Sequence, residues 1–113
     1  MTMFVAYENA KDVVRHLPPI VDALRLRSKD LADQLERAGT SMLLNLAEGN
    51  RRSGKDKRRF FVMAHGSAGE IRAVLEIAAL WGWGVDQAVV APILDRQLGL
   101  LWGLTHSRKV TKS

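Results

Sequence analysis

The chain has 113 residues and a formal net charge of +5, and 47% of its residues are hydrophobic and 26% charged. This composition is typical of one globular domain over residues 1–113 and excludes a disordered chain. The absence of cysteine excludes disulfides and thiolate zinc sites and favours a reducing compartment. The first residues lack the pattern of a signal peptide, and no apolar run reaches the roughly 18 residues of a membrane-spanning helix. We therefore expect a cytoplasmic protein with no membrane association.

The first predicted helix covers residues 8–26, after a short lead-in at residues 1–7. Pro18 and Pro19 interrupt its apolar pattern, because a proline inside a helix removes a backbone donor and clashes with the preceding turn. The chain there either kinks or divides into two helices, and we favour one kinked helix. The residues that recur at the three and four spacing of one helical face are Val14, Leu17, Val21 and Leu24.

Two longer helices are predicted over residues 28–49 and 54–81. Ser28 is a suitable N-cap for the first, and Gly49 followed by Asn50 supplies a C-cap that tolerates a left-handed backbone. Each helix carries a seam with the alternating four and three spacing of a bundle. The seams are Leu31, Leu35, Ala38, Met42, Asn45 and Gly49 in the first helix, and Phe60, Ala64, Ser67, Ile71, Val74, Ala78 and Trp81 in the second.

Two glycines, Gly66 and Gly69, lie in the middle of the 54–81 helix. Each costs roughly 1 kcal/mol relative to alanine in a helix interior. We therefore expect packing against a neighbouring helix to require them.

A fourth helix is predicted over residues 86–105, with Pro92 near its start. No run of useful length alternates with the period of two that indicates a strand. The connections between the predicted helices are short, which favours antiparallel neighbours. The predicted fold is all-α: an antiparallel, up-down-up-down four-helix bundle.

The excess positive charge is concentrated in one segment after the second predicted helix. Six basic residues there meet a single acidic one, Asp56, whereas the remaining eleven basic residues of the chain are balanced by eleven acidic residues. A local excess of this kind suits a contact with a polyanion, although a solvated loop between two helices has the same pattern. The predicted phosphate contacts are Arg51, Arg52, Lys55, Lys57, Arg58 and Arg59.

Polar residues lie on or beside the seams of the two long helices. Such groups need hydrogen-bond partners, and each one left unpaired costs about 1–3 kcal/mol. We interpret them as a network that sets the helix register; the alternative is an enzyme site with Glu48 and Glu70 as an acid–base pair. The residues are Gln34, Ser41, Asn45, Glu48, Ser67 and Glu70.

The sequence contains no pattern of a known catalytic or metal site. The Glu-x-x-His pairs of di-iron bundles, His-Glu-x-x-His and Gly-x-Ser-x-Gly are all missing, and GNRRSGK at residues 49–55 departs from a phosphate-binding loop where Asp56 replaces Ser or Thr. We expect no enzyme activity, no metal and no cofactor. Three tryptophans are expected near one end of the bundle, as core or as an interface: Trp81, Trp83 and Trp102.

The chain resembles a known family in two stretches. Asn45-Leu46-Ala47-Glu48-Gly49, preceded by Gln34-Leu35, Arg37-Ala38 and Ser41, is similar to the proteins encoded by intervening sequences in bacterial 23S ribosomal RNA genes. Phe60, Phe61, Ala64, Gly66-Ser67 and Glu70 continue the resemblance, which covers residues 17–104. The basic segment also resembles the accessory variability determinant of diversity-generating retroelements, in the same superfamily. Gly39, Met42 and Gly69 depart from the usual pattern, which leaves the branch of the family open.

The resemblance implies a four-helix bundle that assembles as a homopentameric ring and has no catalytic activity. For the retroelement branch it also implies a basic surface that contacts a reverse transcriptase and nucleic acid. The leading hypothesis is therefore a homo-oligomeric bundle that binds nucleic acid, RNA or an RNA/DNA–protein complex, through the basic segment. The alternative is a protein–protein adaptor with incidental nucleic-acid affinity.

Overall fold

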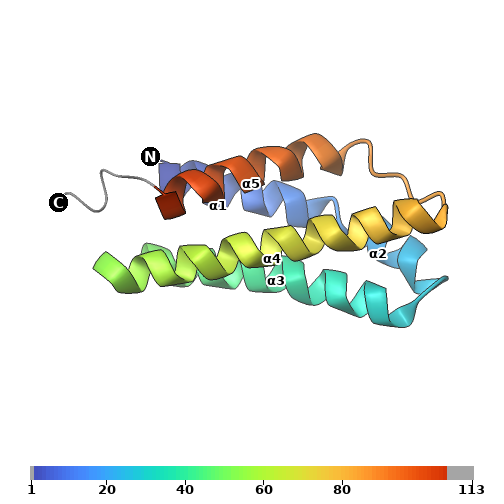
Figure 1. Cartoon of the computed structure of the whole chain (residues 1–113), viewed down its shortest axis with the longest axis horizontal. Helices are drawn as coiled ribbons and strands as arrows, with labels where there is room; N and C mark the ends of the chain where they lie inside the picture. Colours follow the sequence, from blue (N-terminus) through green and yellow to red (C-terminus); the bar gives the residue numbers. More distant parts are fainter. Residues whose placement is uncertain (1, 107–113) are drawn as a thin grey trace.

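The computed structural model describes residues 2–106, which form five α-helices along a rod of 48 × 21 × 20 Å (Figure 1). The all-α class is confirmed for these residues, since they contain no strand. The helices are α1 (Thr2–Arg15), α2 (Pro18–Arg25), α3 (Lys29–Asn50), α4 (Gly54–Trp81) and α5 (Val90–His106).

Four helical arms enclose one core, with α1 and α2 together forming the first arm (Figure 1). α3 packs against α1, α2 and α4, and α5 packs against α1 and α4. Contacts between α3 and α4 occur in opposite order along the two helices. Gly49 near the end of α3 faces Phe61 near the start of α4, whereas Ser41 contacts Ser67 further along α4. The largest fully buried side chains include Val13, Leu24, Leu35, Met42, Leu46, Ile71 and Leu101.

The chain divides at the two prolines, so the prediction of one kinked helix over residues 8–26 was wrong. Pro18 and Pro19 have no N–H to donate to the carbonyls of the preceding turn, and α1 ends at Arg15. The prolines instead occupy the first positions of α2, where a missing N–H removes no helical hydrogen bond. Residues 2–7, expected as a lead-in, belong to α1.

The N-cap of α3 was predicted correctly, but its C-cap was predicted wrongly. The Ser28 side chain accepts a hydrogen bond from the N–H of Leu31 at 3.2 Å, which confirms the N-cap. At the other end α3 continues through Asn50, and Arg51 has a right-handed backbone. Gly49 is needed for a different reason, because a Cβ there would lie 2.6 Å from the Phe61 ring.

The mid-helix glycines of α4 also have a role different from the predicted one. A Cβ added at Gly66 or Gly69 would meet nothing within 4 Å, so packing within the chain does not require them. They lie instead on an outward stripe with helical spacing, which we call the outer face of α4. It consists of Val62, Gly66, Gly69, Ala73, Ile77 and Leu80.

The fourth predicted helix starts later than residue 86, because side chains hold residues 86–89 in a turn. Asp86 accepts a hydrogen bond from the N–H of Ala88 at 3.0 Å, and Gln87 Nε2 donates to the Leu75 carbonyl at 2.9 Å. α5 then begins at Val90. The Gln87 bond attaches this turn to the last part of α4.

Candidate nucleic-acid interface

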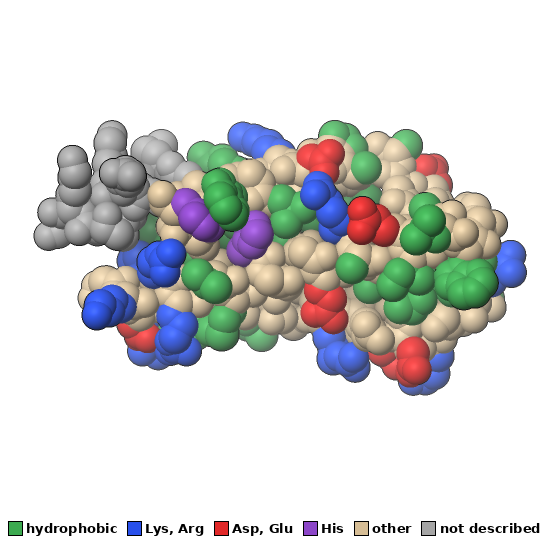
Figure 2. Space-filling view, in the orientation of Figure 1, with side chains coloured by type: hydrophobic (Ala, Val, Ile, Leu, Met, Phe, Trp, Pro, Cys, Tyr) green, Lys and Arg blue, Asp and Glu red, His purple; other side chains and the backbone are tan. Residues whose placement is uncertain are grey.

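The six predicted phosphate contacts lie together at the end of the molecule where α3 connects to α4. Arg51 follows the last residue of α3, Arg52 lies in the connection, and the others lie in the first turns of α4. Figure 2 shows Lys and Arg side chains gathered at this end of the molecule. We call the six residues the basic cluster: Arg51, Arg52, Lys55, Lys57, Arg58 and Arg59.

Half of the basic cluster is paired with two carboxylates. Glu48 contacts Arg52 Nε at 2.9 Å and Arg51 Nη1 at 3.6 Å. Asp56 contacts Arg59 Nη2 at 2.9 Å and Arg52 Nη1 at 2.8 Å. The hydrogen bond from Arg59, with a further one from Arg52, holds the pKa of the Asp56 carboxyl below its ordinary value.

An aromatic ring orders the same guanidinium groups. The Phe60 ring centroid lies 4.5 Å from the guanidinium carbon of Arg59 and 5.3 Å from that of Arg52. A cation over a ring face is attracted by the negative face of the π-system. Arg52 and Arg59 are therefore positioned by Asp56 and Phe60 before any ligand arrives.

The other half of the basic cluster has no carboxylate partner among the described residues. Lys57 Nζ lies 3.2 Å from Met3 Sδ and 5.8 Å from the Phe61 ring centroid. Arg58 Nε donates to the carbonyl of Thr105 at 2.9 Å, which attaches the start of α4 to the last turn of α5. Lys55 is exposed. These cations are available to phosphates, and the stretch from residue 48 to residue 59 keeps four net positive charges.

Three of the six predicted polar-network residues are hydrogen bonded across α3 and α4. The Ser67 hydroxyl donates to the Ser41 hydroxyl at 3.0 Å. Asn45 Nδ2 donates to the Ser41 carbonyl at 2.9 Å and to its hydroxyl at 3.1 Å. The Ser67–Ser41 bond joins α3 and α4 at one register, because a shifted α4 would remove Ser67 from Ser41, whereas the Asn45 bonds lie within α3.

The remaining three, Gln34, Glu48 and Glu70, are not brought into this group. Glu48 pairs with arginines at the surface, and Glu70 is exposed on α4. From the Ser41–Ser67 contact the two glutamates lie seven and three residues away in opposite directions, about 15 Å apart along the axis. The structure therefore does not assemble Glu48 and Glu70 as an acid–base pair.

A second buried polar contact, between α1 and α5, was missed at the sequence level. Asn9 Nδ2 donates to Gln97 Oε1 at 2.9 Å and to the Ile93 carbonyl at 3.0 Å. Gln97 is fully buried, and its Nε2 has no hydrogen-bond partner within residues 2–106. In the sequence, Gln97 occupies a position on the same helical face as the core residues Leu94 and Leu101. That Asn9 is its partner is known only from the packing of α1 against α5.

The three tryptophans do not lie at one end, contrary to the prediction. Trp81, the last residue of α4, stacks with Trp83 just after the helix, with ring centroids 6.5 Å apart. Trp102 lies on α5 toward the basic cluster, beside His65 of α4. Thr105, three residues after Trp102, accepts a hydrogen bond from Arg58 near the start of α4, whereas Trp81 is the last residue of α4, so Trp102 and Trp81 lie toward opposite ends of α4.

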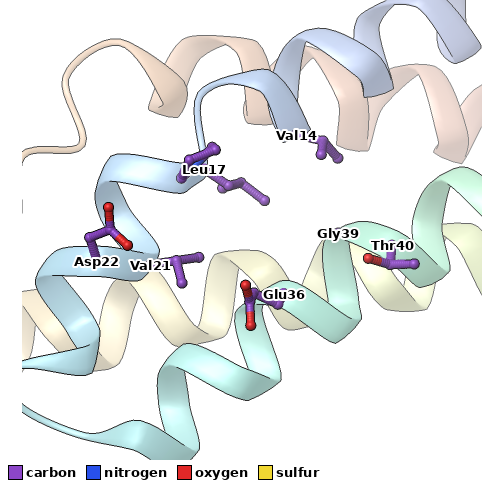
Figure 3. Close-up of a pocket in the computed structure, with 8 residues that line it drawn as sticks. Val14, Leu17, Val21, Asp22, Glu36, Gly39 and Thr40 are labelled. Carbon is purple, nitrogen blue, oxygen red and sulfur yellow. The ribbon is translucent and has the colours of Figure 1, made fainter.

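A pocket of about 260 Å³ lies where α1 ends and α2 begins, over Gly39 of α3 (Figure 3). Val14, Leu17 and Val21 make it apolar, while Asp22 and Glu36 stand at its edge. Two carboxylates disfavour a phosphate group, and the pocket contains no member of the basic cluster. It is therefore not part of the candidate interface.

Residues 2–106 offer neither a metal site nor a membrane-spanning helix. No group of three His, Asp or Glu side chains is placed to hold a metal ion. None of the helices there combines the length and the apolar character needed to cross a membrane.

The fold and the basic cluster define a small helical-bundle protein with one strongly cationic end. A family model described as 23S rRNA-intervening sequence protein matches residues 4–88, which is most of the chain. The chain therefore belongs to the family of 23S rRNA-intervening sequence proteins. No curated protein and no solved structure matches it.

Proposed function

We propose that this protein is a non-catalytic, cytoplasmic, homo-oligomeric bundle that binds nucleic acid through the basic cluster. The observation that carries the proposal is the placement of six cations at one end of the rod, with Lys55 and Arg58 free of carboxylate partners among the described residues. Binding through phosphates is weakly sequence-specific and falls steeply with salt. RNA, alone or within an RNA/DNA–protein complex, is the proposed ligand.

The family supports an association with RNA, because its description refers to 23S rRNA. A role as an accessory protein of a diversity-generating retroelement, with a reverse transcriptase as partner, is a finer form of the proposal. The basic cluster is compatible with it, since such a partner would present nucleic acid to the same surface. A pull-down with a reverse transcriptase, with and without nuclease treatment, separates direct protein contact from contact through nucleic acid.

We further propose assembly into a ring, pentameric as the resemblance implies, of antiparallel up-down-up-down bundles. The outer face of α4 supports assembly, because it is an apolar stripe that no part of the described chain covers. Leu80 and Trp81 at its end are 87% and 70% exposed, which is unusual for a chain that stays alone. A ring would place several basic clusters on one particle and strengthen binding to a polyanion.

The nucleic-acid proposal is tested by the double charge reversal Arg58→Glu/Arg59→Glu. We expect affinity for a structured RNA and the slope of its salt dependence both to fall, since two phosphate contacts are lost. The matched control is Arg27→Glu/Arg37→Glu, which changes net charge equally with exposed residues outside the basic cluster. Equal affinity and salt slope for the cluster variant and the wild type would reject the proposal.

Assembly is tested by sedimentation of the wild type and of Ala73→Glu, a charge in the middle of the outer face of α4. We expect the variant to have a lower mass, because an unpaired charge would be buried in the contact. Ala79→Glu, an exposed position on another side of α4, is the control. A wild-type protein that sediments as a monomer would reject the ring.

A protein–protein adaptor is the second candidate, and the outer face of α4 is the observation that favours it. An apolar surface of this kind also suits a different protein. A complex with such a partner would persist at high salt and would depend on apolar residues such as Val62 and Ile77. Nucleic-acid binding that disappears at moderate salt while this complex remains would favour the adaptor.

A further inference from the structure

Trp102 forms an exposed aromatic stack on α5. Its side chain is 56% exposed, and its rings stack on the His106 imidazole with centroids 3.4 Å apart and planes 19° apart. His106 Nδ1 lies 3.0 Å from the Trp102 carbonyl oxygen and 2.7 Å from the Thr105 hydroxyl, which orients the imidazole. The His65 ring of α4 lies 6.2 Å from Trp102 on another side.

This stack lies directly beside the unpaired half of the basic cluster. Arg58 Nε donates to the carbonyl of Thr105, the residue just before His106. Arg58 and His65 are seven residues apart and so share one side of α4, about 10 Å apart along the axis. Only one N–H of the Arg58 guanidinium has a hydrogen-bond partner among the described residues, so its other donors remain for a ligand. Figure 2 shows imidazole, hydrophobic and basic side chains gathered on this part of the surface.

We propose that Trp102 is a stacking platform for an unpaired base, and that Arg58 and Lys55 bind the phosphates of the same strand. Single-stranded nucleic acid is recognised by this combination of aromatic faces and a positively charged path, because every base has a face that can stack. A duplex keeps its bases stacked inside and cannot use the platform. The proposal rests on the proposed nucleic-acid function and adds to it a preference for single-stranded segments.

The test compares binding of a labelled single-stranded oligoadenylate and an RNA duplex of equal length. Trp102→Leu should weaken single-strand binding by about 5- to 150-fold, the effect of removing one stacked base, and leave duplex binding unchanged. Trp102→Phe should recover part of the loss, because it keeps an aromatic face. Leu26→Ala is the control, an exposed apolar residue just after α2 that belongs neither to the basic cluster nor to the outer face of α4 and should change neither affinity.

A second measurement needs no change at Trp102. In the variant Trp81→Phe/Trp83→Phe, Trp102 is the only tryptophan, and saturation with oligoadenylate should quench its fluorescence while the duplex should not. Unchanged emission at saturation, or equal effects of Trp102→Leu on both ligands, would overturn the platform and leave the basic cluster as a phosphate site. A wild-type protein that binds neither ligand would overturn the nucleic-acid function itself, which is a different result.

Discussion

The inner and outer faces of α4 are both apolar, but they have different neighbours. On the inner side the Phe61 ring lies so close to Gly49 of α3 that a Cβ would approach it to 2.6 Å. On the outer side Gly66 and Gly69 have open space where a Cβ would stand. Gly49 is therefore explained by the close approach of α3 and α4. Contacts within the described chain do not explain Gly66 and Gly69.

This difference separates folding from assembly. The inner face contributes to the free energy of unfolding of a single chain through buried residues such as Ile71 and Val74. The outer face adds little buried apolar surface to it unless another molecule covers it. Substitutions at the two faces should therefore have different effects. Gly49→Ala on α3 against the inner face, Gly66→Ala on the outer face and Ser67→Ala on the inner face test this, and a fourth prediction concerns the first turn of α4.

Gly49→Ala should destabilise the chain by about 2 kcal/mol. The added methyl group would overlap the Phe61 ring, and overpacking of this kind outweighs the gain of about 1 kcal/mol in helix propensity. Urea unfolding monitored by circular dichroism measures the change. A variant as stable as the wild type would show that α3 and α4 separate here without cost.

Gly66→Ala should have the opposite effect on the free energy of unfolding and stabilise the monomer by about 1 kcal/mol. The outer face has room for the methyl group, so only the helix propensity changes. The measurement is urea unfolding at a protein concentration low enough for the chain to be monomeric. If a second helix lies against this face in the oligomer, sedimentation of the same variant should show weaker association.

Ser67 follows Gly66 in α4 but faces inward. Ser67→Ala should destabilise the chain by about 0.5–1 kcal/mol. It removes the hydrogen bond from Ser67 to Ser41, while Ser41 still accepts from Asn45. Ser53→Ala is a suitable control, since Ser53 is exposed and its side chain makes no cap hydrogen bond. Thermal unfolding of the three proteins in parallel would detect the difference, and equal midpoints would contradict the prediction.

The smallest change in stability is expected when acid protonates Asp56 in the first turn of α4. The pKa of Asp56 is lowered in the folded chain, so its contribution to stability is present above its ordinary value of 3.8 and is lost as the pH falls through the lower folded pKa. Because this ion pair is exposed, the shift in unfolding temperature should be small. Asp56→Asn should lose less stability than the wild type below pH 3.8, with Asp30→Asn as a control that lacks an ion pair among the described residues.

The buried amides of α1 and α5 show a limit of sequence reasoning. Asn9 and Gln97 are 88 residues apart and hydrogen bond inside the core. Each looks like a single polar residue on a helix, and the pairing depends on how α1 and α5 are aligned. The same is true of Trp102, whose position beside the basic cluster follows from the return of α5 along α4.

The sequence by itself determined the helical class, the N-cap at Ser28, the span of α4 and the family, because periodicity, capping and motif are properties of neighbouring residues. It also placed the six cations in one segment. Only the tertiary structure decided that Gly49 rather than Gly66 is needed for packing, and that α5 brings Trp102 to the side of α4 that carries Arg58. These outcomes depend on the register between helices, and that register is set by contacts between residues far apart in the chain.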